Sequence, residues 1–477
     1  MRAPKLSPPL VALLGLLAAG GALAQTRPAA PTRPAAPAAT PPAAPAPTTR
    51  LEVPITRERL DNGLRVVLSP DHSVPTVAVA VYYDVGARVE DRGHSGFAHL
   101  FEHLMFEGTD GLPKGEFDRL LALRGADANA TTSEDRTNYF ETLPASSLEL
   151  GVFLEADRMR ALAITAEAFE NQRLTVMEER RQSYENRPYM TSVLRRDELF
   201  YAGYFPYEHS TIGDMADLRA ATLAEVRAFH ARYYAPDNAV IAITGDFEPA
   251  AAMEMVRRHF GPITARRGAP WSDPGFTPPG RERVESIDDP LAEAPAFHML
   301  WHVPPRRTED HYALELLGMI LGHGESSRLH QRLVRDRELL AEVDAGTENR
   351  RGPDMLALWA ICAGDNTPAA VRREVDAVVA DVVARGVTEQ ELRKAKNAQR
   401  AAFVFGLESP LDRAEYLAMT ELYDNDATVV NAELARYDAV TLDDVRRVAG
   451  RYLTADNRLV LDVLPRPPAQ GAPAATP

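Results

Sequence analysis

Cysteine is nearly absent from this chain, which has one among 477 residues. A single thiol cannot form a disulfide within the chain, so stability must come from packed cores. That residue, Cys362, ends the apolar run Leu356–Cys362. We therefore expect it to be a buried small hydrophobic side chain.

Positive charge is scarce relative to negative charge. Lys and Arg total 53 against 68 Asp and Glu, so the formal net charge is -15. This balance argues against nucleic acid and anionic membrane surfaces as partners, although it carries no information on the fold. A hydrophobic content of 45% and a charged content of 25% are ordinary for a soluble globular protein, and the length predicts two or three domains.

The apolar run near the N-terminus, Leu10–Ala19, is too short to span a bilayer comfortably. Arg2 and Lys5 precede it, and Ala22-Leu23-Ala24 follows it as a small-x-small cleavage site. This order is typical of a secretory signal peptide. We expect residues 1–24 to be cleaved and no stable membrane insertion of the protein.

Residues 25–50 consist almost entirely of Pro, Ala, Thr and Arg. Such a composition cannot build a core, so we expect an extended linker. Export together with the linker favours a bacterial periplasmic location. The alternative is a protein tethered to the membrane by an uncleaved N-terminus.

The most informative segment is His99-Leu-Phe-Glu102-His103. Two histidines four residues apart lie on one face of a helix and can bind a single metal ion. Zinc lowers the pKa of a bound water to about 7, and Glu102 stands where a carboxylate can take its proton. This H-x-x-E-H order indicates a zinc hydrolase, and the alternative is a histidine pair on a partly buried amphipathic helix. We expect Ser95 to cap the helix and Gly108 to end it.

The chain contains an internal repeat. The segment Thr222–Arg227 returns as Thr441–Arg446, an offset of 219 residues, and further identities follow in the same register. Each copy predicts a capped helix, a turn and a closing strand. The expected fold class is α+β, with two homologous domains that each have a mostly antiparallel sheet and helices packed on one face.

The domain boundaries follow from composition, because a Pro/Gly/Asp-rich stretch separates the two copies. Asp61-Asn62-Gly63 predicts a hairpin turn near the start of the first domain. The repeat offset moves His99 to Gly318, so the second domain carries no copy of the zinc motif. The expected division is a signal peptide at 1–24, a linker at 25–50, an N-terminal catalytic zinc-binding domain at 51–267, an interdomain linker at 268–290, a C-terminal non-catalytic domain at 291–466 and a disordered tail at 467–477.

A catalytic zinc takes three protein ligands and keeps one position open. The third ligand must come from elsewhere in the chain, and the segment Val176–Gln182 is the obvious candidate. It lies on a helix expected over residues 166–184. The charge pattern alone favours a solvated helix face, so a ligand here needs further support.

The segment His94–Thr109 resembles the active-site helix of the pitrilysin, or insulinase, family of zinc peptidases, which includes mitochondrial processing peptidase. The likeness covers roughly residues 51–464. It implies that His99, His103 and Glu179 bind one zinc ion per chain, with Glu178 as the weaker choice for the third ligand. It also implies that Glu102 is the general base of an endopeptidase that cleaves peptides or unfolded segments. Other segments that resemble family landmarks are Asp61–Leu64, Asn129–Thr132, Asn186–Pro188 and Ser326–Leu329.

The resemblance implies a substrate site as well. In the family, the segment corresponding to Asn129–Phe140 is an edge strand, and the substrate adds to it as an extra strand. Asn129 and Ala130 are therefore the expected substrate-binding residues. The simpler interpretation is an ordinary strand with Tyr139 in the core.

Two departures from the family pattern concern activity. Gln172 stands where many members have a glutamate, seven residues before the ligand glutamate. Active members also need an Arg and Tyr pair, and the corresponding segment here, Arg335–Glu342, has no tyrosine at Ala341 or Glu342. We therefore expect a partner chain, either a second copy or, as the favoured form, a related subunit without zinc that supplies the pair. The alternative function is a non-catalytic structural or substrate-binding subunit of the same fold.

Overall fold

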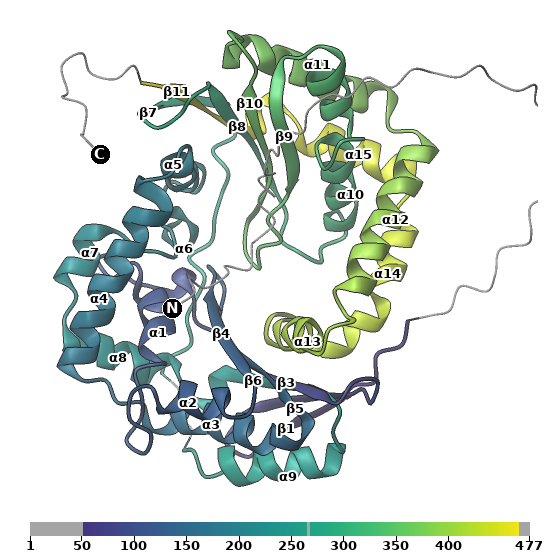
Figure 1. Cartoon of the computed structure of the whole chain (residues 1–477). Helices are drawn as coiled ribbons and strands as arrows, with labels where there is room; N and C mark the ends of the chain where they lie inside the picture. The colour runs from purple at the N-terminus through teal and green to yellow at the C-terminus, as the bar shows by residue number, and fades with distance from the viewer. Residues whose placement is uncertain (1–50, 265–267, 467–477) are drawn as a thin grey trace, which may run out of the picture. The chain divides into compact units, whose positions relative to one another are not determined.

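The computed structural model describes residues 51–264 and 268–466 (Figure 1). The expected signal peptide, the linker at 25–50 and the C-terminal tail lie outside these residues. The described residues from Leu51 onward belong to one compact unit. Across the described ranges, no helix is both long enough and apolar enough to cross a membrane.

The first domain is built on a six-stranded sheet with the order β1-β2-β6-β3-β5-β4. Neighbouring strands are antiparallel except β2 and β6, which are parallel. Asp61-Asn62-Gly63 forms the predicted turn between β1 and β2, where Gly63 adopts a φ of +93° that disfavours any side chain. The strands are β1 (Thr56–Arg59), β2 (Arg65–Pro70), β3 (Thr76–Tyr83), β4 (Asp127–Thr132), β5 (Thr137–Pro144) and β6 (Ala239–Gly245).

The second domain is built on a five-stranded sheet with the order β7-β11-β8-β10-β9. It is antiparallel except for the parallel pair of β7 and β11. Strand β7 lies inside the segment 268–290, which the sequence indicated as a linker, so the sheet of the second domain begins within that segment. The strands are β7 (Arg283–Asp289), β8 (Ala296–Val303), β9 (Leu340–Thr347), β10 (Asp354–Cys362) and β11 (Arg458–Pro465).

Helices follow the strands of each sheet along the chain. In the first domain they are α1 (Phe97–Leu104), α2 (Glu116–Ala122), α3 (Leu148–Ala161), α4 (Ala166–Arg180), α5 (Met190–Phe200), α6 (Phe205–Glu208), α7 (Met215–Ala220), α8 (Leu223–Tyr233) and α9 (Pro249–Phe260), with short turns η1 (Ala87–Val89), η2 (Ala145–Ser147), η3 (Arg181–Glu185) and η4 (Pro236–Asn238). In the second they are α10 (His311–Leu321), α11 (Pro368–Arg385), α12 (Glu389–Phe405), α13 (Pro410–Asp424), α14 (Val430–Ala439) and α15 (Leu442–Tyr452), with η5 (His330–Asp336), η6 (Ala427–Val429) and η7 (Ala455–Asn457).

Each sheet is covered on one face by helices of its own domain and on the other by helices of the other domain. Successive residues of a strand face opposite sides, so Val77 and Val79 of β3 join the core with α1, α3 and α9. Ala78 and Ala80 face the other way and pack with Leu417 of α13, which lies beside the first sheet (Figure 1). On the second sheet, residues of α5 and α6 pack against β8, β10 and β11.

The structure confirms the internal repeat. Thr222 and Thr441 each cap a helix, α8 and α15, through a reciprocal capping box with the residue three positions on. The turns η4 and η7 follow, and then the closing strands β6 and β11. Asn238 and Asn457 serve the same purpose in the two copies, because each side chain donates to the last carbonyl of the preceding helix at 2.9 Å.

Candidate metal centre

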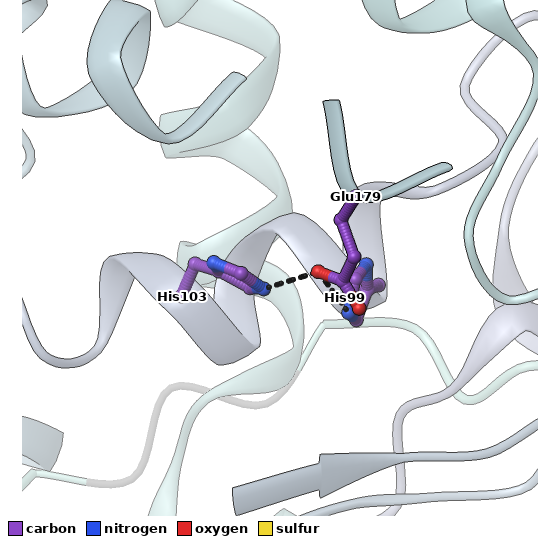
Figure 2. A group of neighbouring side chains, drawn as sticks. All are labelled: His99, His103 and Glu179. Carbon is purple, nitrogen blue, oxygen red and sulfur yellow. Dashed lines mark ion pairs between the residues drawn. The ribbon is translucent and has the colours of Figure 1, made fainter. Parts of the chain in front are cut away.

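Three side chains from two helices converge at one point of the first domain. His99 and His103 project from α1 and Glu179 from α4, and one ligand atom of each lies within 4.8 Å of the others (Figure 2). Glu179 Oε2 lies 3.3 Å from His103 Nε2 and 3.7 Å from His99 Nε2. Glu178, the weaker choice for the third position, instead pairs at the surface with Arg181.

The charges of the three groups are set by burial and by one another. Burial lowers the pKa of His99, which favours the neutral imidazole. Burial opposes charge at His103 too, but the hydrogen bond with Glu179 and the Coulombic attraction of Glu102 and Glu179 together raise the pKa of His103. Burial acts to raise the pKa of Glu179, yet the hydrogen bond from His103 and the Coulombic attraction of both histidines lower it. Glu179 is therefore a carboxylate at neutral pH.

Gln172 fixes the orientation of the second histidine. It lies on α4 two turns before Glu179, and its Oε1 lies 3.2 Å from His103 Nδ1. The amide Nε2 of Gln172 donates to Glu107 at 2.6 Å, so its Oε1 is the end that faces the ring and His103 Nδ1 is the donor. His103 Nε2 is the nitrogen that faces Glu179, and a cation bound there would take the place of the proton that the two groups share. Gln172 thus provides an acceptor at the position where the resemblance to the family predicts a glutamate.

The start of α1 differs from the expectation. Gly96, not Ser95, is the N-cap residue, and its φ of +91° and the approach of Gly213 leave no room for a side chain. Ser95 Oγ donates to Asp217 at 2.6 Å instead of capping the helix. The helix ends at Leu104, before the expected glycine at 108.

A carboxylate from outside the helix supplies the missing cap. Glu90 accepts hydrogen bonds from Gly96 N at 2.9 Å and Ala98 N at 2.7 Å. His209 Nε2 lies 2.9 Å from the same carboxylate, and its Nδ1 lies 2.7 Å from Phe205 O. Burial raises the pKa of Glu90, and the hydrogen bond to Glu90 raises the pKa of His209 against the effect of burial. The pair escapes local sequence patterns because its members lie far apart in the chain.

Glu102 points from α1 to the neighbouring edge strand. Thr132 Oγ1, at the end of β4, donates to Glu102 Oε2 at 2.5 Å. Asn129 and Ala130 lie on the same strand, and Ala130 N donates to Asn129 Oδ1 at 2.9 Å. Tyr139 is on β5, fully buried, and its hydroxyl donates to a carbonyl of α1. The segment 129–140 is thus an edge strand followed by an inner strand, with the tyrosine in the core.

The segment aligned with the family's Arg and Tyr pair runs from the end of η5 into β9. Arg335 bonds to Asp336, and Arg337 forms an ion pair with Glu374 of α11. Strand β9 is an edge of the second sheet. Both arginines are therefore engaged with carboxylates of their own domain.

The donor set fits zinc. Two imidazole nitrogens and one carboxylate oxygen are the ligands of many catalytic zinc sites, which keep a fourth position for water or substrate. Both Nε2 atoms face Glu179, while Gln172 engages Nδ1 of His103 and the buried Nδ1 of His99 has no hydrogen-bond partner among the described residues. A cation at this point would pair with the anionic Glu179 in a largely buried setting.

Comparisons with known proteins agree with this geometry. Two family models match the chain, that of insulinase (peptidase family M16) at residues 65–204 and that of the peptidase M16 inactive domain at residues 220–399. The chain is similar to "Zinc protease PqqE" of Helicobacter pylori, with 31% identity over 401 residues that cover 82% of this chain and 89% of the relative. It is also similar to a probable mitochondrial-processing peptidase subunit beta of Arabidopsis thaliana, with 26% identity, 84% of this chain and 77% of the relative covered.

A solved structure shows the same fold. The crystal structure of a protease from Helicobacter pylori matches with a TM-score of 0.81 and 28% identity, and the match covers 87% of this chain and 100% of that chain. Helix α1 lies inside the first family model and the second model begins after it, in line with a repeat in which one copy carries the H-x-x-E-H motif.

Proposed function

Because this chain belongs to the insulinase (M16) family of peptidases, we propose that it is a zinc-dependent endopeptidase acting on peptides or unfolded polypeptide segments. The observation that supports this most is the convergence of His99, His103 and Glu179 within 4.8 Å. These three residues would hold one zinc ion per chain, and Glu102 would be the general base.

Zinc, when bound, supplies a Lewis acid that polarises a peptide carbonyl and lowers the pKa of water. Glu102 takes a proton from the attacking water and gives it to the leaving amine nitrogen. The Thr132 hydroxyl holds the Glu102 carboxylate in place for both transfers. Gln172 keeps the His103 ring turned toward the centre, and the low pKa of Glu179 keeps that ligand anionic.

We propose that the substrate pairs with β4. This strand is an edge of the first sheet and packs beside α1, so a peptide on its exposed edge would run next to Glu102. Asn129 and Ala130 lie on the strand three and two residues, respectively, before Thr132. The backbone amide of Ala130, now bonded to the Asn129 side chain, would be one of the donors to the substrate.

The test measures bound metal and cleavage together. In Glu102→Gln we expect stoichiometric zinc and a loss of peptide hydrolysis of about 10³-fold, within the range for removal of a general base. Glu178→Gln is the matched control, since this exposed neighbour of Glu179 should change neither quantity. Full activity of Glu102→Gln on a fluorogenic peptide library would refute the mechanism. Tight zinc without any cleavage, even with a partner present, would favour the non-catalytic subunit.

We also propose that activity requires a second chain, because Arg335–Glu342 contains no tyrosine. The favoured partner is a related subunit without zinc that supplies an Arg and Tyr pair. Co-purification from the native host, followed by mass measurement in solution, should yield a heterodimer with higher activity than the isolated chain. A fully active monomer would exclude the requirement.

The location is proposed to be periplasmic. Residues 1–24 have the order of a cleaved signal peptide. Cell fractionation should place the protein in the periplasm, and mass spectrometry should find a mature N-terminus at Gln25. A full-length chain in the membrane fraction would instead indicate the tethered form.

A further inference from the structure

The general base is held by the last residue of β4, and that strand leads directly into the β4–β5 turn (residues 133–136). Thr132 contributes the hydroxyl that binds Glu102. Within the turn, Ser133 N donates to Arg136 O at 2.9 Å, and Arg136 donates back to Thr131 O at 2.8 Å. The position of the turn therefore fixes the end of β4 and the hydroxyl next to Glu102.

Asp135 anchors this turn from within the structure. It is 5% exposed, and its Oδ1 accepts the hydroxyl of Tyr207 at 2.7 Å. Its Oδ2 accepts the backbone N–H of Arg351 at 2.9 Å, and Arg88 Nε lies 3.3 Å away. The Tyr207 hydroxyl also accepts the N–H of Gly352 at 2.8 Å. One carboxylate thus joins the turn to a segment of the second domain.

That segment is the β9–β10 loop (residues 348–353). Its Arg350 is 5% exposed, with Glu134 of the turn 3.3 Å away and the ring of Tyr207 beneath its guanidinium. The next residue, Arg351, forms an ion pair with Asp84 at 2.7 Å. Because Arg350 is buried, removal of its carboxylate partner would leave an uncompensated charge, which is costly.

A second contact from the second domain reaches the same strand. Glu415 on α13 accepts the side-chain amide of Asn138 at 2.9 Å, and Asn138 Oδ1 accepts the hydroxyl of Thr131 at 2.5 Å. The end of β4 is thus held from two sides by residues outside the catalytic domain. Neither contact touches the residues that converge at the metal centre.

We infer that the second domain positions the general base: the β9–β10 loop, through Asp135 and the β4–β5 turn, fixes Thr132 and thereby Glu102. This inference rests on the proposed peptidase function and assigns a task to the domain that lacks the zinc motif. Asp135 and Tyr207 are positioning residues, because they act on Glu102 only through Thr132. Small displacements of a catalytic group can cost one to two orders of magnitude in rate.

The test is a double-mutant cycle between Asp135→Asn and Thr132→Val. Asp135→Asn should lower kcat about tenfold with KM little changed and zinc still stoichiometric. In the Thr132→Val background the same substitution should lower kcat less than twofold, since the link to Glu102 is already cut. An equal loss of kcat in both backgrounds, or no loss in either, overturns the inference. If Asp135→Asn does not fold, Tyr207→Phe takes its place in the cycle.

Asp310→Asn is the control for lost stability. Asp310 is a buried carboxylate of the second domain that accepts from Arg447, Arg451 and the hydroxyl of Tyr452. Its substitution should lower the melting temperature to a similar extent and leave kcat unchanged. A fall in kcat as large as that of Asp135→Asn would attribute the effect to stability and overturn the inference.

Hydrogen exchange on the same variants separates this inference from the proposed function. Asp135→Asn should speed amide exchange in β4 and the β4–β5 turn, and Asp310→Asn should not. Unchanged exchange in β4 overturns the inference whether or not any peptide is cleaved. Absence of cleavage by the unsubstituted protein, with the exchange difference present, refutes the peptidase function and leaves the coupling in place.

Discussion

Each of the two domains packs a helix against an edge strand of its sheet. The residues at this helix–strand contact differ between the domains. In the first domain α1 packs on β4, and in the second α10 packs on β9. The repeat offset of 219 sets Gly318 and Gly322 at the positions of His99 and His103. A Cβ on Gly322 would lie 2.5 Å from Ala345 N, and one on Gly318 would lie 3.0 Å from Gly346 Cα.

The two glycines therefore let the helix and strand of the second domain approach closely. In the first domain, polar side chains occupy the corresponding space. Where α1 presents imidazoles and Glu102 toward its surroundings, α10 and the residue after it bring backbone against backbone. A metal site needs side chains with room around them, and the close contact excludes that room. The same pairing of a helix with an edge strand thus leaves room for a cluster of polar side chains in one copy and is closely packed in the other.

The largest expected effect comes from removal of one of the three proposed metal ligands in the first domain. His103→Ala should abolish stoichiometric zinc binding and lower peptide hydrolysis by about 10³-fold or more, because one of three ligands is lost. His323→Ala, which removes an exposed histidine just after α10, should leave both unchanged. Metal analysis and a peptide assay measure the contrast. Retention of bound zinc in His103→Ala would show that His103 is not a zinc ligand, and the proposed difference between the two domains would then fail.

The next effect tests the closed contact of the second domain. Gly322→Ala should lower the free energy of unfolding by about 2–3 kcal/mol, since its Cβ would overlap the backbone of Ala345. Gly111→Ala, where no atom lies within 4 Å, should change it by no more than about 0.5 kcal/mol. Urea unfolding measures both. Equal stability of the two variants would show that α10 and β9 separate at little cost.

A smaller effect is expected from the glutamine that orients the ligand. Gln172→Ala should weaken zinc binding about tenfold, because the His103 ring loses the acceptor for its Nδ1 proton. Gln182→Ala is the control, because the side chain of Gln182 makes its one hydrogen bond among the described residues to Glu178. Competition with a chelator measures the affinity. An unchanged affinity of Gln172→Ala would assign the ring orientation to packing alone.

Sequence patterns predicted those parts of the molecule whose cause is local. The capping boxes at Thr222 and Thr441 are fixed by residues three positions apart, and the structure confirms both helices. The spacing of His99 and His103 needs only helical periodicity. Glu179 is different, because charge pattern alone could not separate it from Glu178, and the family resemblance made the choice that the geometry supports.

The features that sequence reasoning missed are nonlocal. Strand β7 has few apolar residues and owes its conformation to parallel pairing with β11 at the far end of the chain. The cap of α1 depends on Glu90 and His209, which the fold brings together across 119 residues. Helix α13 has an ordinary amphipathic pattern that does not reveal which sheet it covers. Such contacts are decided by tertiary packing.

The smallest expected effect is on stability and concerns two capping boxes, one at the start of α8 in the first domain and one at the start of α12 in the second. In α12, the Glu391 carboxylate accepts a hydrogen bond from the Thr388 hydroxyl and also pairs with Arg328 at 2.6 Å. The hydrogen bond from Arg328 is the largest cause that lowers the pKa of Glu391 to about 2. Glu391→Gln should therefore cost about 1 kcal/mol at pH 7, a figure reduced by partial exposure of the carboxylate. Because the folded pKa lies below the unfolded value, this contribution is complete above about pH 4.5 and is lost as the pH falls toward 2.

Glu225 of α8 is the matched control for Glu391. It accepts hydrogen bonds from the N-cap residue Thr222 in the same way, but it is exposed and has no arginine partner among the described residues. Chemical unfolding of both glutamine variants between pH 7 and pH 3 measures the difference. Glu391→Gln should lose more stability than Glu225→Gln at pH 7, and the two should converge as the pH falls. A gap at pH 3 as large as the gap at pH 7 would contradict the assignment to the Arg328 ion pair, because the charge-dependent contribution of Glu391 should already be decreasing at that pH.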